Sequence, residues 1–198
     1  MWFLDPERPL ATCVAESCVG CPVGDKLHCH FRFRELAHFM LISAPLFILG
    51  GAGIYRISGW MLALWFLMIM GYFGFLEIRV MCSHCPHYAE PGRTLRCWAN
   101  YGAAKLWRYR PGPMSFSEKF LFLGGLITIF VYPSAFMLLG GQWFLLLVYV
   151  VVGAGNFVTV RMFLCTQCIN FACPLNLVED RTRAHFRERN PTPPERSA

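Results

Sequence analysis

The sequence predicts an all-α integral membrane protein with four transmembrane helices, arranged as two repeated helical hairpins with a cysteine-rich cytoplasmic cap. Three observations predict this fold class. Hydrophobic residues make up 56% of the chain and charged residues only 15%, against roughly 25% charged residues in soluble domains. The apolar residues gather in four long runs. All ten cysteines and nearly all basic residues lie outside those runs.

Each of the four apolar runs is long enough to cross a bilayer, which takes about 20 residues per helix. The runs cover residues 36–55, 60–75, 120–139 and 143–160. The stretch SFSE has the spacing of a capping box and marks the start of the third helix. The short turns GIYRISGW and LGGQW join the runs into two hairpins. A soluble helical bundle is a poor alternative, because these runs leave little polar surface.

The distribution of basic residues predicts the orientation in the membrane. The runs divide the chain into a cysteine-rich N-terminal segment, a first hairpin, a cysteine-containing loop, a second hairpin and a cysteine-rich tail: 1–34, 35–77, 78–118, 119–161 and 162–198. All Lys and Arg residues except Arg56 lie before the first run, between the second and third, or after the fourth. By the positive-inside rule, we expect this face and both termini to be cytoplasmic, in the inner (cytoplasmic) membrane.

The two hairpins resemble each other in sequence. SAPLFILGG in the first helix parallels PSAFMLLGG in the third, and the second and fourth helices end in IRVMCSHCP and VRMFLCTQC. Each unit reads helix, Gly-Gly turn, helix, arginine and Cys-x-x-Cys. Units of two spans keep the same orientation and are related by a pseudo-twofold axis along the membrane normal. We expect this symmetry to bring the two Cys-x-x-Cys turns together beneath the bundle.

The cysteines form three groups, and each group contains a Cys-x-x-Cys pair. The groups are Cys13, Cys18, Cys21 and Cys29; Cys82, Cys85 and Cys97; and Cys165, Cys168 and Cys173. A Cys-x-x-Cys turn presents two thiolates to one metal. Proline follows Cys21, Cys85 and Cys173, one cysteine of each group, as at the Cys-Pro end of bacterial ferredoxin cluster runs. On a reducing face of the membrane, this pattern indicates metal or redox chemistry rather than structural disulfides.

Iron–sulfur clusters are the favoured cofactor. A [4Fe–4S] cluster takes four thiolates, so the cysteines could hold one or two clusters. One partition uses the N-terminal group for one cluster and draws the second from the central and C-terminal groups. Zinc is the alternative, because it accepts four thiolates or three with a histidine. The histidines beside the cysteines are His28, His30, His84 and His87. A dithiol redox pair is disfavoured, because most of the cysteines would be surplus.

These features predict a membrane-bound iron–sulfur electron-transfer protein, a subunit or partner of a redox complex; any catalytic role would be that of an oxidoreductase subunit. A cytoplasmic redox protein is the expected partner, and the membrane quinone pool is a candidate second partner. A zinc-stabilised membrane scaffold or assembly protein without catalytic activity is the alternative. Glu77 and Arg79, at the end of the second run, are interpreted as interfacial. The net charge of +6 is too small to indicate a nucleic-acid partner.

Overall fold

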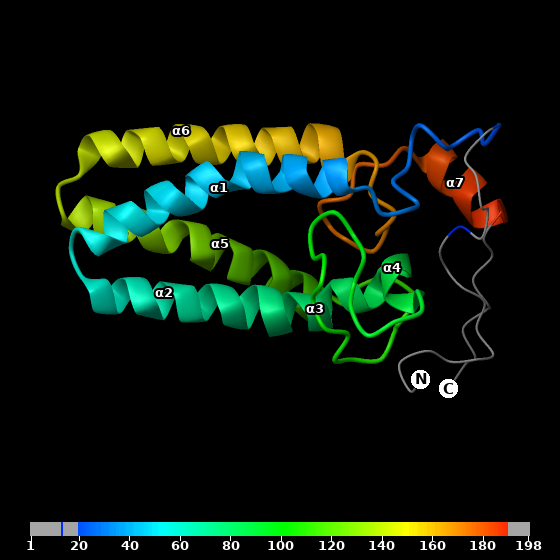
Figure 1. Cartoon of the computed structure of the whole chain (residues 1–198), viewed down its shortest axis with the longest axis horizontal. Helices are drawn as coiled ribbons and strands as arrows, with labels where there is room; N and C mark the ends of the chain where they lie inside the picture. The colour runs from blue at the N-terminus through cyan, green and yellow to red at the C-terminus, as the bar shows by residue number, and fades with distance from the viewer. Residues whose placement is uncertain (1–12, 14–19, 190–198) are drawn as a thin grey trace.

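The computed structural model describes residue 13 and residues 20–189, and this part of the chain is helical with no β-strand. Four long helices pack side by side (Figure 1). They are α1 (Phe33–Tyr55), α2 (Gly59–Gly71) with its continuation η1 (Tyr72–Leu76) and α3 (Glu77–Val80), α5 (Phe116–Leu139), and α6 (Trp143–Thr159) with η3 (Val160–Cys165). The short elements at one end are η2 (Cys82–His84), α4 (Pro86–Ala89) and α7 (Asp180–Arg189).

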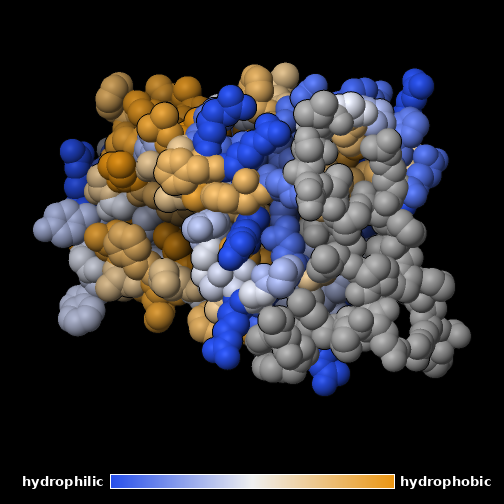
Figure 2. Space-filling view, turned by 45° about the vertical axis from the view of Figure 1, so that its right-hand side comes forward, coloured by the Kyte–Doolittle hydropathy of each residue, from blue (hydrophilic) through white to orange (hydrophobic). Residues whose placement is uncertain are grey.

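Four helical stretches are long and apolar enough to cross a membrane, which confirms the four predicted spans. They cover Phe33–Tyr55, Gly59–His84, Phe116–Leu139 and Trp143–Cys165, with mean hydropathies between 1.7 and 2.0. Hydrophobic side chains cover the surface over these stretches (Figure 2). The second and fourth spans run further than the sequence predicted. Cys82 and Cys165 therefore lie in the last turns of two spans, and not in the loops that follow them.

The helices α1 and α5 form the inner pair of the bundle. Each of them contacts the other three long helices, whereas α2 and α6 lie on either side of this pair. Close packing depends on Gly50, where a Cβ would lie 3.1 Å from Trp65, 3.2 Å from Pro133 and 3.3 Å from Tyr149. Small residues at such crossings let helices approach closely in a membrane, where van der Waals packing drives association.

Side-chain hydrogen bonds to helix carbonyls join the bundle across its interior. Pro133 in α5 lacks an N–H group, which leaves the carbonyl of Ile129 without its helical donor. The indole Nε1 of Trp65 donates to that carbonyl at 3.0 Å, and the Tyr149 hydroxyl donates to Phe130 O at 3.1 Å. In a lipid environment no water replaces such partners, so these bonds fix how α2, α5 and α6 meet.

The two hairpin turns differ, and one prediction is wrong. In the second hairpin Gly140 ends α5 and Gly141 has a φ of +63°, so the Gly-Gly pair forms the predicted turn. In the first hairpin Gly50 and Gly51 lie inside α1, and the chain turns only after Tyr55. The glycines stay helical there because their missing side chains make room for Trp65.

The three cysteine-bearing segments lie at the same end of the bundle (Figure 1). We call this the polar end; among the described residues it comprises 20–32, 85–115 and 166–189. Hydrophilic residues gather there, beside the apolar surface of the helices (Figure 2). A short charged helix, α7, follows near the C-terminus and ends at Arg189 among the described residues. Both hairpin turns lie at the opposite end (Figure 1).

Candidate metal centre

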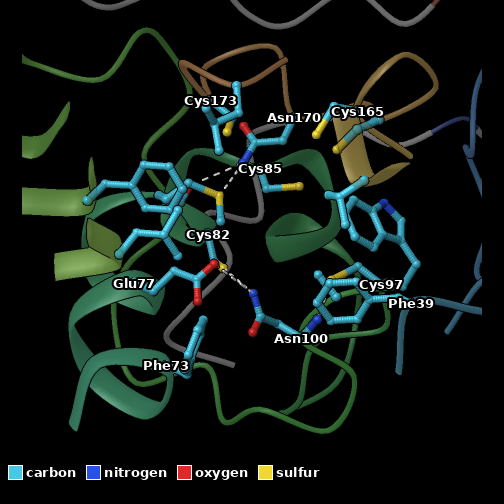
Figure 3. A pocket seen from close by; sticks show the side chains of 18 of the residues that line it. Phe39, Phe73, Glu77, Cys82, Cys85, Cys97, Asn100, Cys165, Asn170 and Cys173 are labelled. Carbon is cyan, nitrogen blue, oxygen red and sulfur yellow. Dashed lines mark hydrogen bonds between the residues drawn. The ribbon is translucent and has the colours of Figure 1, made fainter. Parts of the chain in front are cut away.

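A cavity of about 190 Å³ lies where the polar end meets the four long helices. Six cysteines line it, and they come from two segments far apart in the sequence: Cys82, Cys85, Cys97, Cys165, Cys168 and Cys173. Figure 3 shows five of these side chains around one common space. The structure thus brings together the central and C-terminal cysteine groups.

The central cysteines are positioned by two consecutive turns and a loop. The turn after α3 is closed by a bond from the Cys85 N–H to Cys82 O at 2.9 Å, and Pro86 then begins α4. Cys97 lies in a loop whose two arms pair between Leu95 and Ala103, where the backbone N···O distance is 2.8 Å. This pairing returns the loop toward the end of α3, and Cys97 comes to face the same cavity as Cys82 and Cys85.

The C-terminal cysteines are held by a compact set of turns after η3. The N–H of Leu177 donates to Cys165 O at 3.1 Å, and the N–H of Cys173 donates to Asn170 O at 3.2 Å. The side-chain amide of Asn176 donates to Cys168 O at 2.7 Å and to Asn170 O at 3.1 Å. These bonds fold the segment back on itself, so three thiols separated along the chain line one cavity wall.

The side chain and backbone of Asn100 both donate hydrogen bonds to cysteine sulfurs. Its backbone N–H donates to Cys97 Sγ at 3.2 Å, and its side-chain amide donates to Cys82 Sγ at 3.3 Å. The same amide lies 3.3 Å from Glu77 Oε1. Because N–H donors stabilise a thiolate more than a neutral thiol, Asn100 favours the charged form that binds metals.

Backbone N–H groups two or three residues further along the chain lower the pKa of four of the six thiols. They are those of His87 for Cys85, Ala99 and Asn100 for Cys97, Asn170 for Cys168, and Leu175 and Asn176 for Cys173. The reduction potential of an iron–sulfur cluster depends on such hydrogen bonds to its sulfurs. The donors are in place where four thiolates would need them.

Burial opposes ionisation of these thiols. Loss of solvation raises the pKa of Cys97 to about 11 and that of Cys173 to about 12, against the effect of their N–H donors. Burial also raises the pKa of Cys85 and of Cys168, and the neighbouring thiols add to the shift. These thiols are neutral at pH 7 without a metal, which disfavours a reactive dithiol pair. A bound metal would supply the positive charge that deprotonates them.

The sulfurs surround the cavity without converging on one point. Among residue 13 and residues 20–189, no group of three or more His, Cys, Asp or Glu side chains is placed to hold a single metal ion. A tetrahedral zinc site needs each sulfur about 2.3 Å from the ion. The arrangement around the cavity is wider than such a site.

The N-terminal cysteines gather in a second place. Cys29 belongs to a buried cluster with Val23, Leu27 and Ile169, and Cys13 and Cys21 pack against it. The N–H of His28 donates to Gln167 O at 2.7 Å, which ties this segment to the loop that carries Cys168. Cys18 lies outside the described residues. The cysteines in the described part of the chain thus lie in two separate places.

The histidines named as zinc ligands have other partners or lie elsewhere. His87 lines the cavity, but its Nδ1 lies 2.7 Å from Glu90 Oε1. His84 bonds to Gly112 O and lies 3.4 Å from Glu118 Oε2. His28 lies 3.4 Å from Glu35 Oε1, and burial lowers its pKa. His30 lines a different hollow with Phe31, Glu90, Pro91 and Arg96.

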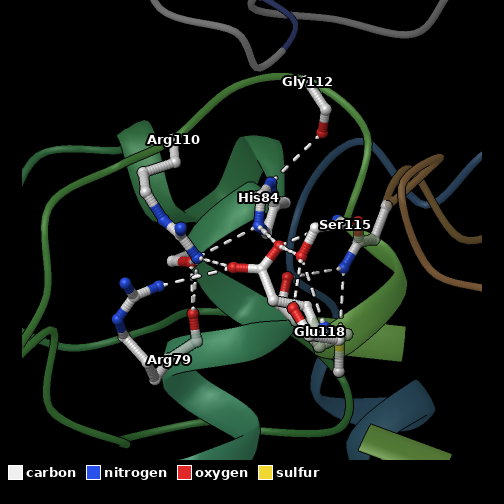
Figure 4. Close-up of polar contacts among 10 residues, drawn as sticks. Arg79, His84, Arg110, Gly112, Ser115 and Glu118 are labelled. Carbon is white, nitrogen blue, oxygen red and sulfur yellow. Dashed lines mark hydrogen bonds and ion pairs between the residues drawn. The ribbon is translucent and has the colours of Figure 1, made fainter. Parts of the chain in front are cut away.

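A polar network ties the central loop to the start of α5 (Figure 4). The Glu118 carboxylate accepts from Arg110 and from the Ser115 N–H, and it lies 3.6 Å from Arg79. The Ser115 hydroxyl accepts from the Glu118 N–H, so the predicted capping box is confirmed. Because Arg79 lies three residues before Cys82, this network sets the direction in which the central cysteines leave the bundle.

Glu77 lies in a different position from the one that the sequence predicts. It is only 6% exposed and lines the cavity together with the cysteines, whereas the sequence suggested an interfacial position. The three cavity-lining asparagines of the polar end, Asn100, Asn170 and Asn176, were also missed. Asparagine is common in loops, and nothing in the spacing of these residues indicated that they bond to sulfurs and to the backbone around them.

Comparison with known proteins identifies no relative: no protein-family model, no curated protein and no solved structure matches this chain. The function is therefore inferred from the cavity and the side chains that line it.

Proposed function

We propose that this chain is a membrane-bound iron–sulfur electron-transfer protein whose cavity holds a [4Fe–4S] cluster. The observation that carries the proposal is the gathering of six cysteines from two distant segments around one cavity, with N–H donors directed at their sulfurs. Thiolates are the usual ligands of such clusters, and hydrogen bonds to the sulfurs tune their reduction potentials.

Four thiols are the best ligands: Cys85, Cys97, Cys168 and Cys173. At each of them a neighbouring backbone N–H group lowers the pKa of the thiol, and each lies beyond the ends of the membrane spans. Cys82 and Cys165 end two spans, and only a side-chain donor is found at Cys82. When bound, the cluster would accept and release single electrons, while this chain's residues hold it and exclude water.

The fit is better for a cluster than for a single zinc ion. The thiols surround a cavity of about 190 Å³, and no three potential ligands among the described residues are placed to hold one ion. A cluster contains four irons and four sulfides, so its ligands stand further apart than those of a single ion. The histidines that would complete a Cys₃His zinc site have other partners or lie outside the cavity.

The arrangement of helices supports the proposed repeat. The first helices of the two hairpins, α1 and α5, form the inner pair, and the second helices, α2 and α6, flank them. A twofold operation that exchanges the hairpins would exchange Cys85 with Cys168, the second cysteine of each Cys-x-x-Cys pair. The other two proposed ligands, Cys97 and Cys173, lie outside this repeat.

The polar end is proposed to face the cytoplasm as a cysteine-rich cap. All basic residues except Arg56 lie in the segments on that side of the spans, as the positive-inside rule requires of cytoplasmic segments. A soluble redox protein on that side would then exchange electrons with the cluster. The N-terminal group of Cys13, Cys18, Cys21 and Cys29 is proposed to hold a second cluster nearer the aqueous surface.

The test is the metal and sulfide content of full-length protein purified without oxygen, together with its visible and EPR spectra. We expect about four irons and four sulfides per cluster, with a reducible visible absorbance. A colourless protein that contains stoichiometric zinc would overturn the proposal and leave the membrane scaffold as the better interpretation.

The ligand assignment is tested by single serine substitutions. Cys85→Ser, Cys97→Ser, Cys168→Ser and Cys173→Ser are each expected to lower the cavity cluster's occupancy at least tenfold. Cys82→Ser and Cys165→Ser are matched controls, because they change the same kind of buried thiol in the same cavity. Equal losses in all six variants would contradict this assignment.

A further inference from the structure

The cavity does not end at the cysteines; it continues between the long helices. Its lining there consists of phenylalanines with one leucine, from α1, η1, α5 and α6: Phe39, Phe47, Phe73, Phe122, Leu126, Phe130 and Phe157. We call this part the aromatic arm. Figure 3 shows Phe39 and Phe73 facing the same space as the cysteines. A packed bundle core would fill this volume, so the arm is built to hold a ligand.

Polar groups in the arm are few and specific. The side-chain amide of Asn156 donates to Ile42 O at 3.0 Å and to Ser43 Oγ at 3.2 Å, and both Ser43 and Asn156 line the arm. Asn156 lies about 13 Å before Cys165 along the helix, at about 1.5 Å per residue. The arm therefore reaches well into the membrane-spanning part of the chain, and every point in it stays close to the thiols.

Two buried oxygens in the cavity wall have no hydrogen-bond partner among the described residues. They are Glu77 Oε2 and Asn170 Oδ1, on side chains that are 6% and 3% exposed. Leaving such atoms without a partner costs about 1–3 kcal/mol each. Both are acceptors, since the Asn170 amide nitrogen already donates to Met81 O. A ligand that fits this cavity is therefore aromatic, apolar and equipped with hydroxyl donors.

The arm also borders the lipid. Phe157 lines the cavity and is 47% exposed on α6, in the apolar outer surface of the bundle. A ligand dissolved in the membrane would therefore reach the arm beside Phe157 without crossing water. The guanidinium of Arg161 lies 5.6 Å from the Phe157 ring, which places a cation at the entrance, where head groups begin.

We propose that the aromatic arm binds a membrane quinol, with Glu77 as a hydrogen-bond acceptor for one ring hydroxyl. This rests on the proposed function, since the neighbouring cluster is the electron carrier. A cluster held by Cys85, Cys97, Cys168 and Cys173 would accept the two electrons of the quinol one at a time, and a soluble redox protein would take up each electron in turn. The two hydroxyl protons of the quinol go to water at the polar end, and a quinone leaves. The reverse direction balances in the same way.

Two variants test the arm against a matched control. Phe73→Trp adds volume inside the arm, whereas Phe75→Trp makes the same change at a side chain in the same helical segment that is 58% exposed and does not line the cavity. Glu77→Gln keeps the shape of the side chain and removes the carboxylate acceptor. We expect Phe73→Trp and Glu77→Gln to weaken quinol binding about tenfold, which is about 1.4 kcal/mol, and Phe75→Trp to leave it unchanged.

The probe is a ring-azido derivative of decylubiquinol, with full-length protein in lipid nanodiscs kept without oxygen. Photolabelling is expected on arm residues, competed by decylubiquinol, and lost in the two arm variants while their cluster absorbance is kept. Labelling that is confined to lipid-facing positions, or equal in Phe73→Trp and Phe75→Trp, would overturn the inference. Because labelling needs no electron transfer, specific labelling in a protein without iron would support the ligand site and refute the cluster.

Discussion

Buried cysteines are common in protein cores, where they pack as small apolar side chains. The cysteines of this cavity differ from such residues in the donors that surround them. Asn100 directs two N–H groups at the sulfurs of Cys97 and Cys82. Neutral thiols are weak acceptors, so these donors have little use in a simple apolar core. They become useful when the sulfurs are charged and bound to a metal.

The metal-free protein should lose stability in alkaline solution. Burial holds the pKa of Cys97 at about 11 and that of Cys173 at about 12, against an ordinary value of 9.0. Above pH 9 the unfolded chain releases protons that the folded chain keeps, so the free energy of unfolding falls by up to about 1.4 kcal/mol per pH unit for each thiol. Below pH 9 this contribution is constant and fully present.

Unfolding of the metal-free protein at pH 8, 9 and 10 without oxygen measures this slope. The double variant Cys97→Ser and Cys173→Ser is the control, since serine does not ionise in this range. A slope in the variant as steep as in the unsubstituted protein would assign the effect to other groups, such as Tyr88, whose pKa burial raises to about 12.

At the scale of single elements, α5 shows how a helix break is used for packing. Pro133 frees the Ile129 carbonyl, and Trp65 Nε1 satisfies it from α2. Trp65→Phe should therefore destabilise the bundle by about 0.6–1.7 kcal/mol, the range of interhelical hydrogen bonds in membranes. In the Pro133→Ala background the restored N–H group supplies the carbonyl, and the same substitution should cost less.

A double-mutant cycle on Trp65 and Pro133, measured by reversible unfolding in mixed micelles, gives the coupling free energy between these two residues. We expect a coupling of about 0.5 kcal/mol or more. Additive effects of Trp65→Phe and Pro133→Ala would show that the hydrogen bond is not the reason for their contact.

The start of α5 depends on Glu118, which both caps the helix and holds the central loop. Its carboxylate accepts from Arg110 and Ser115 and lies near Arg79. Glu118→Gln should destabilise the protein by up to about 1 kcal/mol, the size of a partly exposed ion pair, since glutamine can still accept from the Ser115 N–H. Glu188→Gln is a matched control, because Glu188 is an exposed acid on α7. If both variants unfold alike, the network in Figure 4 does not anchor the loop.

The elements that the sequence predicts well are those set by local pattern. The four spans follow from apolar runs, and the start of α5 follows from Ser115 and Glu118, because capping chemistry is local. The turn of the first hairpin lies in the predicted GIYRISGW stretch, but the Gly-Gly turn of the repeat pattern was wrong there, because Gly50 and Gly51 are turn residues in most contexts. Here their role depends on Trp65, which arrives from another helix. The sequence of α1 alone does not indicate that contact.

At the scale of the whole molecule, the sequence predicted that cysteines of the central and C-terminal groups would meet. It did not predict which of their thiols would line one cavity. The cavity joins Cys97 to Cys168 across 71 residues of sequence and the whole second hairpin, so its shape is set by tertiary packing. The position of Glu77 is also set by tertiary packing and could not be predicted from the local sequence. Its place near the end of an apolar run suggested the membrane surface, whereas its burial follows from the loops that fold over it.

Topology is the property of the whole molecule that the function most requires. If the polar end faces the cytoplasm, a reporter fused to the C-terminus should be cytoplasmic, and one inserted after Arg56 should be exported. Green fluorescent protein and alkaline phosphatase in a bacterial host provide these two readouts, since each is active on only one side of the membrane. An insertion at the Gly141 turn is the internal control, because both hairpin turns lie at the same end (Figure 1). Phosphatase activity from the C-terminal fusion would place the cysteines in an oxidising compartment, where they would form disulfides rather than hold a cluster for a cytoplasmic partner.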